Sequence, residues 1–119
     1  MNKVNLAQKF SQFSEQWSPK IVGRVNDCEV KLAKVEGEFI WHHHEHEDEL
    51  FFVVKGRLTM RLRDREVVID EGEFFVVPRG VEHQPFAARE TWIMMIEPAG
   101  TVNTGNVANE RTVHRPQVM

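Results

Sequence analysis

Residues 20–98 alternate apolar and polar side chains with a period of two, in short segments separated by turn residues. Every second residue is apolar in residues 28–32 and again in residues 58–62. About eight such segments fit into this range, and none shows the longer period of a helix. We therefore expect an all-β fold, a small antiparallel sandwich or barrel. Turns are expected at Asn26-Asp27, Glu36-Gly37, Lys55-Gly56 and Asp64-Arg65.

The residues before this range carry a helical pattern. Leu6, Phe10, Phe13 and Trp17 are spaced by four, three and four residues, which places them on one stripe of an α-helix. Asn5 is suited to cap its first turn, and Ser18-Pro19 is expected to end it. We therefore predict an N-terminal helix within residues 1–18.

The chain is interpreted as a single domain over residues 1–119, since this length suits one hydrophobic core. Residues 20–98 would form the barrel. Residues 99–119 contain Gly, Asn and Thr but few large apolar groups, so they cannot order themselves alone. We expect an extended tail that either drapes over the barrel or frays.

Composition excludes several classes of protein. With 41% hydrophobic and 28% charged residues, the chain is too apolar for a disordered protein and too polar for a membrane protein. A net charge of −3 offers no general attraction for nucleic acid. Cys28 is the one cysteine, which precludes an internal disulfide, and no apolar run reaches the length of a membrane span. We expect a cytoplasmic protein.

Four of the six histidines fall within residues 42–46. In a strand, His42 and His44 would share one face, and His43 would point to the other. Two such imidazoles can reach one metal ion at roughly 2.1 Å per bond. Glu49 opens the next apolar segment, where a buried carboxylate is costly unless it is paired or bound to a metal. This makes Glu49 the natural third ligand.

His83 is a candidate fourth ligand. It follows Gly80 by three residues and begins a segment that contains Pro85. If that segment borders the same cavity, the site holds three imidazoles and one carboxylate, which suits one divalent ion: Fe, Mn, Ni or Zn. Four protein ligands would leave positions open for water or a substrate.

These segments resemble a known family. Residues 37–56 are similar to the first cupin motif, with its glycines at the ends and His42, His44 and Glu49 at the motif spacing. Residues 72–83, GEFFVVPRGVEH, are similar to the second motif. The resemblance implies a jelly-roll barrel with one metal ion held at His42, His44, Glu49 and His83, and it implies a homodimer. Residues 97–105 are also similar to a branch of short single-domain bacterial cupins.

Two positions depart from the motifs. Four residues separate Gly37 from His42 where the family usually has five, so we expect a small shift in that loop. Ala87 stands where the second motif often has asparagine. That change removes a polar group that some relatives have near the strand edge.

Other side chains have two interpretations. His46 would act as a substitute ligand only if the strand continued through the acidic turn after His44, and His43 would serve in packing or in dimer contact. Three arginines alternate with apolar residues and either face solvent or line the cavity, where they would hold an anionic substrate. They are Arg57, Arg61 and Arg63.

Two functions fit these features. The first is an enzyme of isomerase, lyase or dioxygenase type, whose metal ion activates a small oxygen-rich or carbonyl substrate. The sequence contains no tyrosine, so protons would move through a glutamate, a histidine such as His46 or metal-bound hydroxide. The second is a non-catalytic, metal-dependent module that binds or senses a small molecule.

Overall fold

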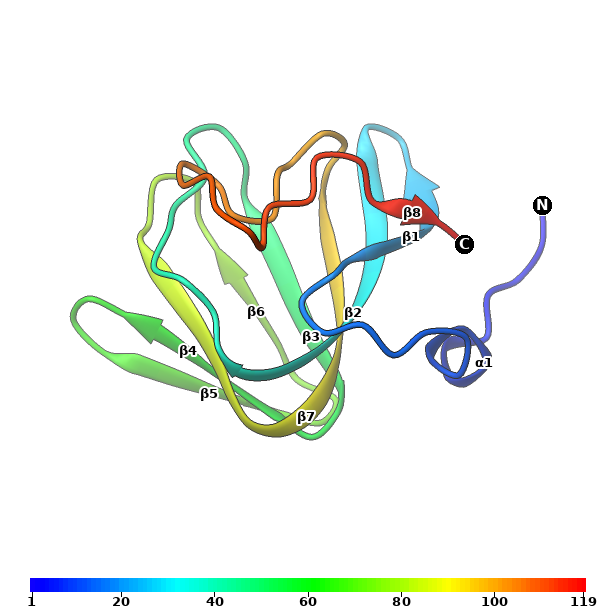
Figure 1. Ribbon diagram of the computed structural model, residues 1–119, viewed down its shortest axis with the longest axis horizontal. Coiled ribbons are helices and arrows are strands. Elements are labelled where there is room, and N and C mark those ends of the chain that lie inside the picture. The colour runs from blue at the N-terminus through cyan, green and yellow to red at the C-terminus, as the bar shows by residue number, and fades with distance from the viewer.

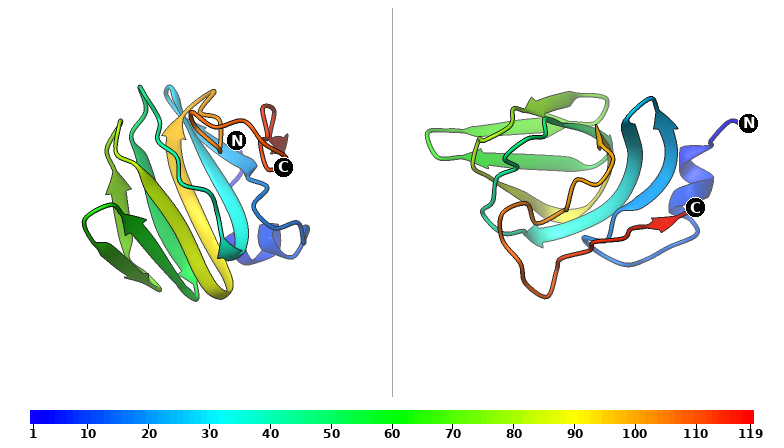
Figure 2. Two further views of the ribbon diagram at one scale, coloured as in Figure 1. Left: turned by 60° about the vertical axis from the view of Figure 1, so that its left-hand side comes forward. Right: turned by 90° about the horizontal axis from the view of Figure 1, so that it is seen from above.

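The computed structural model describes residues 1–119 and consists of a short helix followed by eight strands in one branched sheet (Figure 1, Figure 2). This confirms the predicted all-β fold. The sheet curls around a core as a jelly-roll barrel does, although its hydrogen-bonded path does not close. The elements are α1 (Leu6–Phe10), β1 (Lys20–Val25), β2 (Cys28–Glu38), β3 (Glu49–Lys55), β4 (Arg57–Leu62), β5 (Glu66–Asp70), β6 (Phe74–Val77), β7 (His83–Pro98) and β8 (Gln117–Val118).

Strand β7 organises the sheet because it is long enough to pair with three others. It runs antiparallel to β2 along most of its length, its first residues pair with β4, and its later residues pair with β3. Hairpins then add β5 to β4, and β6 pairs with β3. His83 therefore begins β7 opposite Leu62 of β4, while the start of β3 lies near the end of β7.

The core lies inside the curled sheet, and a second apolar layer covers part of its outer face. The inner core includes Val53, Leu58 and Met60, none of which is exposed. Outside the sheet, Phe10 of α1 stacks on Trp92 with ring centroids 4.7 Å apart and packs near Leu32. Strand β2 is thus covered on both faces.

The helix is shorter than the sequence pattern predicted. Asn5 caps it as expected, since its side-chain oxygen accepts a hydrogen bond from the Gln8 backbone N–H at 2.9 Å. The helix nevertheless ends at Phe10, and Trp17 has a left-handed backbone with a φ of 56°. Phe13 and Trp17 reach the sheet by a non-helical path, in which the Trp17 backbone N–H donates to the Lys34 carbonyl. The spacing of the apolar residues predicted which side chains pack on the sheet, but it did not predict the path of the backbone between them.

Two further segments differ from the strand pattern. Residues 39–44, where the histidine spacing assumes a strand, form no strand, and His42 makes an isolated bridge with His83 there. The tail drapes over the barrel, and its β8 pairs in parallel with β1. The Met119 backbone N–H donates to the Ile21 carbonyl at 2.8 Å.

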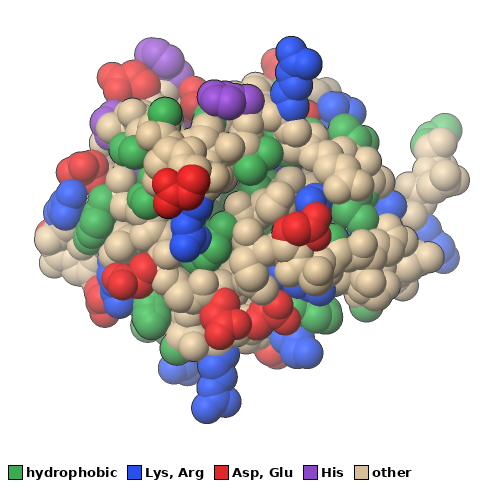
Figure 3. Space-filling view, in the orientation of Figure 1, with side chains coloured by type: hydrophobic (Ala, Val, Ile, Leu, Met, Phe, Trp, Pro, Cys, Tyr) green, Lys and Arg blue, Asp and Glu red, His purple; other side chains and the backbone are tan.

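Acidic and basic side chains pair with each other at several places on the surface. Figure 3 shows acidic and basic groups interspersed on the face it draws. Arg57 pairs with Asp70 at 2.7 Å, and Arg61 pairs with both Glu38 and Glu66. The one α-helix has five residues, which is far short of a membrane span.

Candidate metal centre

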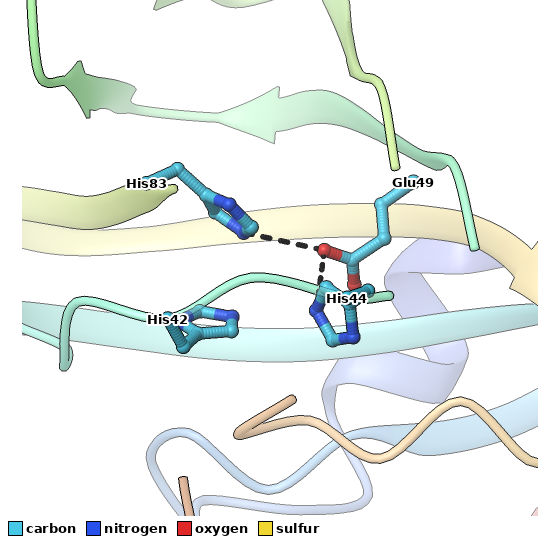
Figure 4. A group of neighbouring side chains, drawn as sticks. All are labelled: His42, His44, Glu49 and His83. Carbon is cyan, nitrogen blue, oxygen red and sulfur yellow. Dashed lines mark ion pairs between the residues drawn. The ribbon is translucent and has the colours of Figure 1, made fainter. Parts of the chain in front are cut away.

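Four predicted site residues come together from three separate segments (Figure 4). His42 and His44 belong to the extended segment after β2, Glu49 is the first residue of β3, and His83 is the first residue of β7. His42 and His83 exchange backbone hydrogen bonds of 3.0 and 2.9 Å. The Gly80 N–H donates to the His44 carbonyl at 2.8 Å. Backbone pairing therefore fixes the imidazole-bearing segments side by side.

The four side chains converge at a buried point. One nitrogen or oxygen atom from each lies within 4.8 Å of the others. None of the four residues is more than 4% exposed. Glu49 Oε1 lies 2.8 Å from His44 Nε2 and 3.3 Å from His83 Nε2.

Three of these converging atoms have no hydrogen-bond partner: His44 Nε2, Glu49 Oε1 and His83 Nε2. Although Glu49 Oε1 lies close to both nitrogens, none of the three atoms makes a hydrogen bond, and the side chains that carry them converge on one buried place (Figure 4). A buried polar atom without a partner is costly, and a bound cation would satisfy all three. This donor set of nitrogen and oxygen atoms fits a divalent metal ion.

Two of the imidazoles are held by backbone carbonyls. Nδ1 of His42 lies 3.0 Å from the Ile40 oxygen, and Nδ1 of His83 lies 2.9 Å from the Val81 oxygen. A carbonyl only accepts, so each Nδ1 carries the proton and each Nε2 keeps its lone pair. Metal-binding histidines commonly have such an outer partner.

The electrostatics favour the protonation states that a metal requires. Burial and the neighbouring His83 lower the pKa of His42 to about 4, which keeps that ring neutral. Burial opposes ionisation of Glu49, but the neighbouring Glu97, His44 and His83 side chains outweigh it and hold the pKa of Glu49 well below its usual range. Neutral imidazoles and an ionised carboxylate are the ligand forms.

A mostly apolar cavity adjoins two of the four residues. Its volume is about 450 Å³, counting the solvent space at its mouth. His42 and Glu49 lie on its wall with Glu97 and Asn103. The remaining lining side chains are apolar: Trp17, Pro19, Ala33, Val35, Phe39, Phe51, Pro85, Ile93 and Met95.

The other candidate residues lie away from this point. His46 is exposed because the chain bends at Glu45 and His46, which removes the condition for a substitute ligand. His43 points outward and pairs with Glu45 at 3.1 Å. The arginines do not line the cavity: Arg57, Arg61 and Arg63 are each paired with an acidic residue on the outer surface.

Sequence reasoning missed two buried charges next to the site, Lys31 and Glu97, each 2% exposed. The alternation in β2 makes Val30 and Leu32 the apolar residues on one face of the strand and puts Lys31 on the other face. In the structure Lys31 faces inward, and Leu32 is covered on the other face. A sequence period of two shows that side chains alternate between the two faces of a strand. It does not identify which face points into the barrel when both faces are covered.

Comparison with known proteins identifies the family to which this fold and sequence belong. A family model described as "Cupin domain" matches residues 28–98, which is more than half of the chain. The chain belongs to the cupin family. This confirms the resemblance to the cupin motifs, and it agrees with the fold.

Individual relatives agree with this membership. The cupin is 35% identical to YdbB of Bacillus subtilis (strain 168) over 86 residues, which are 71% of this chain and 76% of that protein. A solved cupin-2 domain protein from Shewanella frigidimarina NCIMB 400 superimposes with a TM-score of 0.79 at 47% identity. That match covers 80% of this chain and 93% of the solved one.

Part of the chain is similar in sequence to an enzyme. The cupin is 35% identical to 3-hydroxyanthranilate 3,4-dioxygenase of Bos taurus over 60 residues, or 47% of this chain. Those residues are 21% of the dioxygenase, so the cupin spans only about a fifth of that enzyme's length.

Proposed function

We propose that this cupin binds one divalent metal ion through His42, His44, Glu49 and His83 and acts as an enzyme on a small oxygen-bearing substrate. The observation that supports the proposal is the convergence of four buried ligand atoms within 4.8 Å, three of them without hydrogen-bond partners. A bound Fe, Mn, Ni or Zn ion would supply a Lewis acid that polarises substrate oxygens.

The side chains around the ion would have distinct tasks. His42, His44 and His83 would bind through neutral Nε2 atoms, and Glu49 would add the one negative charge. The apolar cavity wall would exclude water and orient the substrate. Trp17 and Phe39 stack at 4.7 Å between ring centroids and form part of this wall.

Among isomerase, lyase and dioxygenase chemistry, we place the dioxygenase type first. The partial relationship to 3-hydroxyanthranilate 3,4-dioxygenase supports this choice. The cavity supports it independently, because its many apolar side chains suit a flat ring better than a polyhydroxylated sugar. The proposed substrate is therefore a small ring compound that presents one or two oxygens to the metal.

Oxygen consumption tests this proposal directly. Metal-free protein is reloaded with Fe(II), Mn(II), Ni(II) or Zn(II) and supplied with aromatic diols and aminophenols, with uronates and diketones as alternatives. We expect oxygen uptake with at least one redox-active ion and a ring substrate, and none with the His44→Ala variant. If no metal and substrate pair turns over while the same compounds still raise the melting temperature, the enzyme proposal fails.

A non-catalytic binding or sensing module is the second candidate, because the cavity has few groups free to move a proton. No tyrosine is present in the chain, and the Asn103 side chain is committed to the backbone of Arg111 and Val113. The homodimer implied by the resemblance stays a prediction. Light scattering of the purified protein measures its assembly state.

A further inference from the structure

An arginine of the C-terminal tail lies against the aromatic part of the cavity wall. The guanidinium carbon of Arg111 lies 5.7 Å from the ring centroid of Trp17 and 5.8 Å from that of Phe39. Both rings line the cavity beside the candidate metal centre, and their centroids are 4.7 Å apart. Contact with two aromatic faces attracts a cation, so these rings hold the positive charge of Arg111 at the cavity wall.

Hydrogen bonds within the tail fix the backbone of Arg111. Its carbonyl accepts from Asn103 Nδ2 at 2.8 Å, and its N–H donates to Asn109 Oδ1 at 2.8 Å. Asn103 itself lines the cavity, and its Oδ1 accepts from the Val113 N–H at 2.8 Å. The tail therefore places Arg111 next to a residue of the cavity lining.

The guanidinium of Arg111 forms no ion pair, although the residue is partly buried. Other arginines pair with acidic side chains: Arg24, Arg57, Arg61, Arg63 and Arg79. The remaining arginines, Arg65, Arg89 and Arg115, are exposed, so water hydrates their charge. An arginine stays charged in a protein, and withdrawing that charge from water costs free energy unless a partner compensates. Arg111 is thus a partly buried cation without an anion.

The charged groups of the cavity lining leave this cation available. Glu49 and Glu97 line the cavity, but Glu49 belongs to the candidate metal centre. Lys31 Nζ donates to Glu97 Oε1 at 2.8 Å, so these two buried charges balance each other. The proposed metal ion and Arg111 are then the groups that could attract an anionic part of a bound molecule.

We propose that Arg111 binds an anionic group, such as a carboxylate, on the ring compound whose oxygens reach the metal. This inference rests on the proposed function and narrows its substrate class to small ring acids. A guanidinium presents two parallel N–H donors, which match the two oxygens of a carboxylate. The ring would lie along the apolar wall, against Trp17 and Phe39. Binding of the anion would supply the partner that Arg111 lacks.

Binding to the Zn(II)-loaded protein tests this role without requiring turnover. The probes are the two catechol carboxylates, with the carboxylate next to a hydroxyl or further around the ring, and each is compared by calorimetry with its neutral amide. We expect wild type to prefer at least one acid over its amide. In Arg111→Gln this preference should fall by about tenfold or more, because charge-assisted hydrogen bonds are lost, while the Kd for the amide stays within about threefold. Comparing the two preferences cancels the effect of the carboxylate on the metal-binding hydroxyls.

Two further variants separate anion binding from general charge and from structural damage. Arg115→Gln is the matched control, since it removes the same charge from an exposed position in the same tail, and it should keep the wild-type preference. Arg111→Lys keeps the charge but loses the planar pair of donors, so its preference should be intermediate. If Arg111→Gln does not fold, as judged by circular dichroism, Arg111→Lys decides.

The outcomes distinguish this inference from the function on which it rests. Equal binding of acid and amide by wild type, or an unchanged preference in the Arg111 variants, would overturn the role of Arg111 alone. Equal losses for acid and amide would also overturn it, because they would show that Arg111 only supports the cavity wall. A wild-type protein that binds none of these compounds would overturn the proposed ring substrate, and this inference with it.

Discussion

His43 and His44 are neighbours in sequence but have opposite environments. His44 is 4% exposed and its Nε2 points at Glu49, whereas His43 lies on the outer side of the segment beside Glu45. Alternation along an extended chain separates them, as the sequence predicted. The adjacent pair therefore offers a matched comparison of a ligand and a non-ligand.

We predict that His44→Ala and Glu49→Ala lose most of their bound metal and that His43→Ala keeps it. Each of the first two changes removes one of four ligand atoms, while the third removes an imidazole outside the cluster. Elemental analysis of the purified variants measures the metal content per chain. Equal metal content in all three would refute the ligand assignment.

The buried His42 predicts a pH dependence for the metal-free protein. Its pKa is about 4 in the folded chain and about 6.5 when unfolded, so between these values the unfolded chain binds an extra proton. Stability is therefore fully present above pH 6.5 and is lost as the pH falls toward 4. The loss from this one group is at most about 3 kcal/mol.

Urea unfolding in the presence of a chelator measures this loss. The His42→Gln variant lacks the titrating ring, so its free energy of unfolding should fall less steeply between pH 6.5 and pH 4 than that of wild type. The difference between the two proteins isolates His42 from the other titrating groups. Parallel pH profiles would contradict the assignment of this dependence to His42.

At the scale of elements, the tail clamps the segment that carries His42 and His44. The Asn106 N–H donates to the His43 carbonyl at 3.1 Å, and the His43 N–H donates to Asn106 Oδ1 at 2.9 Å. Gly105 has a φ of 57°, and a Cβ there would collide with the His43 carbonyl and approach His42 Cδ2 at 3.0 Å. Only glycine fits this contact without displacing the two histidines.

We predict that Gly105→Ala weakens metal binding, whereas Gly100→Ala does not. Both glycines have a positive φ, so both changes cost about 1 kcal/mol or more in backbone strain. A Cβ at Gly100 meets nothing within 4 Å, so that variant carries the strain without the collision. Calorimetric metal titrations of the two variants provide the comparison. Equal metal affinities would show that the tail does not set the geometry of the histidines.

Some structural elements could be predicted from the sequence, and others could not. Strand positions and the β4–β5 turn at Asp64 and Arg65 followed from alternation and turn residues, because both are local properties. The predicted helix was too long, because Phe13 and Trp17 pack against the sheet from a non-helical backbone. Glu97 was not foreseen beside Glu49, because that contact depends on the register between β3 and β7. Register is a tertiary property that neither strand encodes alone.

For the whole molecule, the proposed ion would act as a cross-link between segments that are distant in sequence. Its ligands belong to the segment after β2, to the start of β3 and to the start of β7. An ion that binds the folded chain and not the unfolded chain stabilises the folded state by mass action. In the unfolded chain His83 is no longer held beside His42, His44 and Glu49, which are close to one another in sequence.

We predict that a metal ion at 100 times its Kd stabilises the protein by about 2.7 kcal/mol, which should raise the melting temperature by about ten degrees. A thermal melt recorded with and without a chelator measures this shift. Glu49→Gln should melt at one temperature in both conditions, since it loses the charged ligand but retains nearly the same volume. Zn(II) is the suitable probe because it has no redox chemistry that could damage the protein during heating. A shift that persists in Glu49→Gln would mean that the ion stabilises the chain elsewhere, such as at the exposed His46, and not by joining the three segments at the barrel mouth.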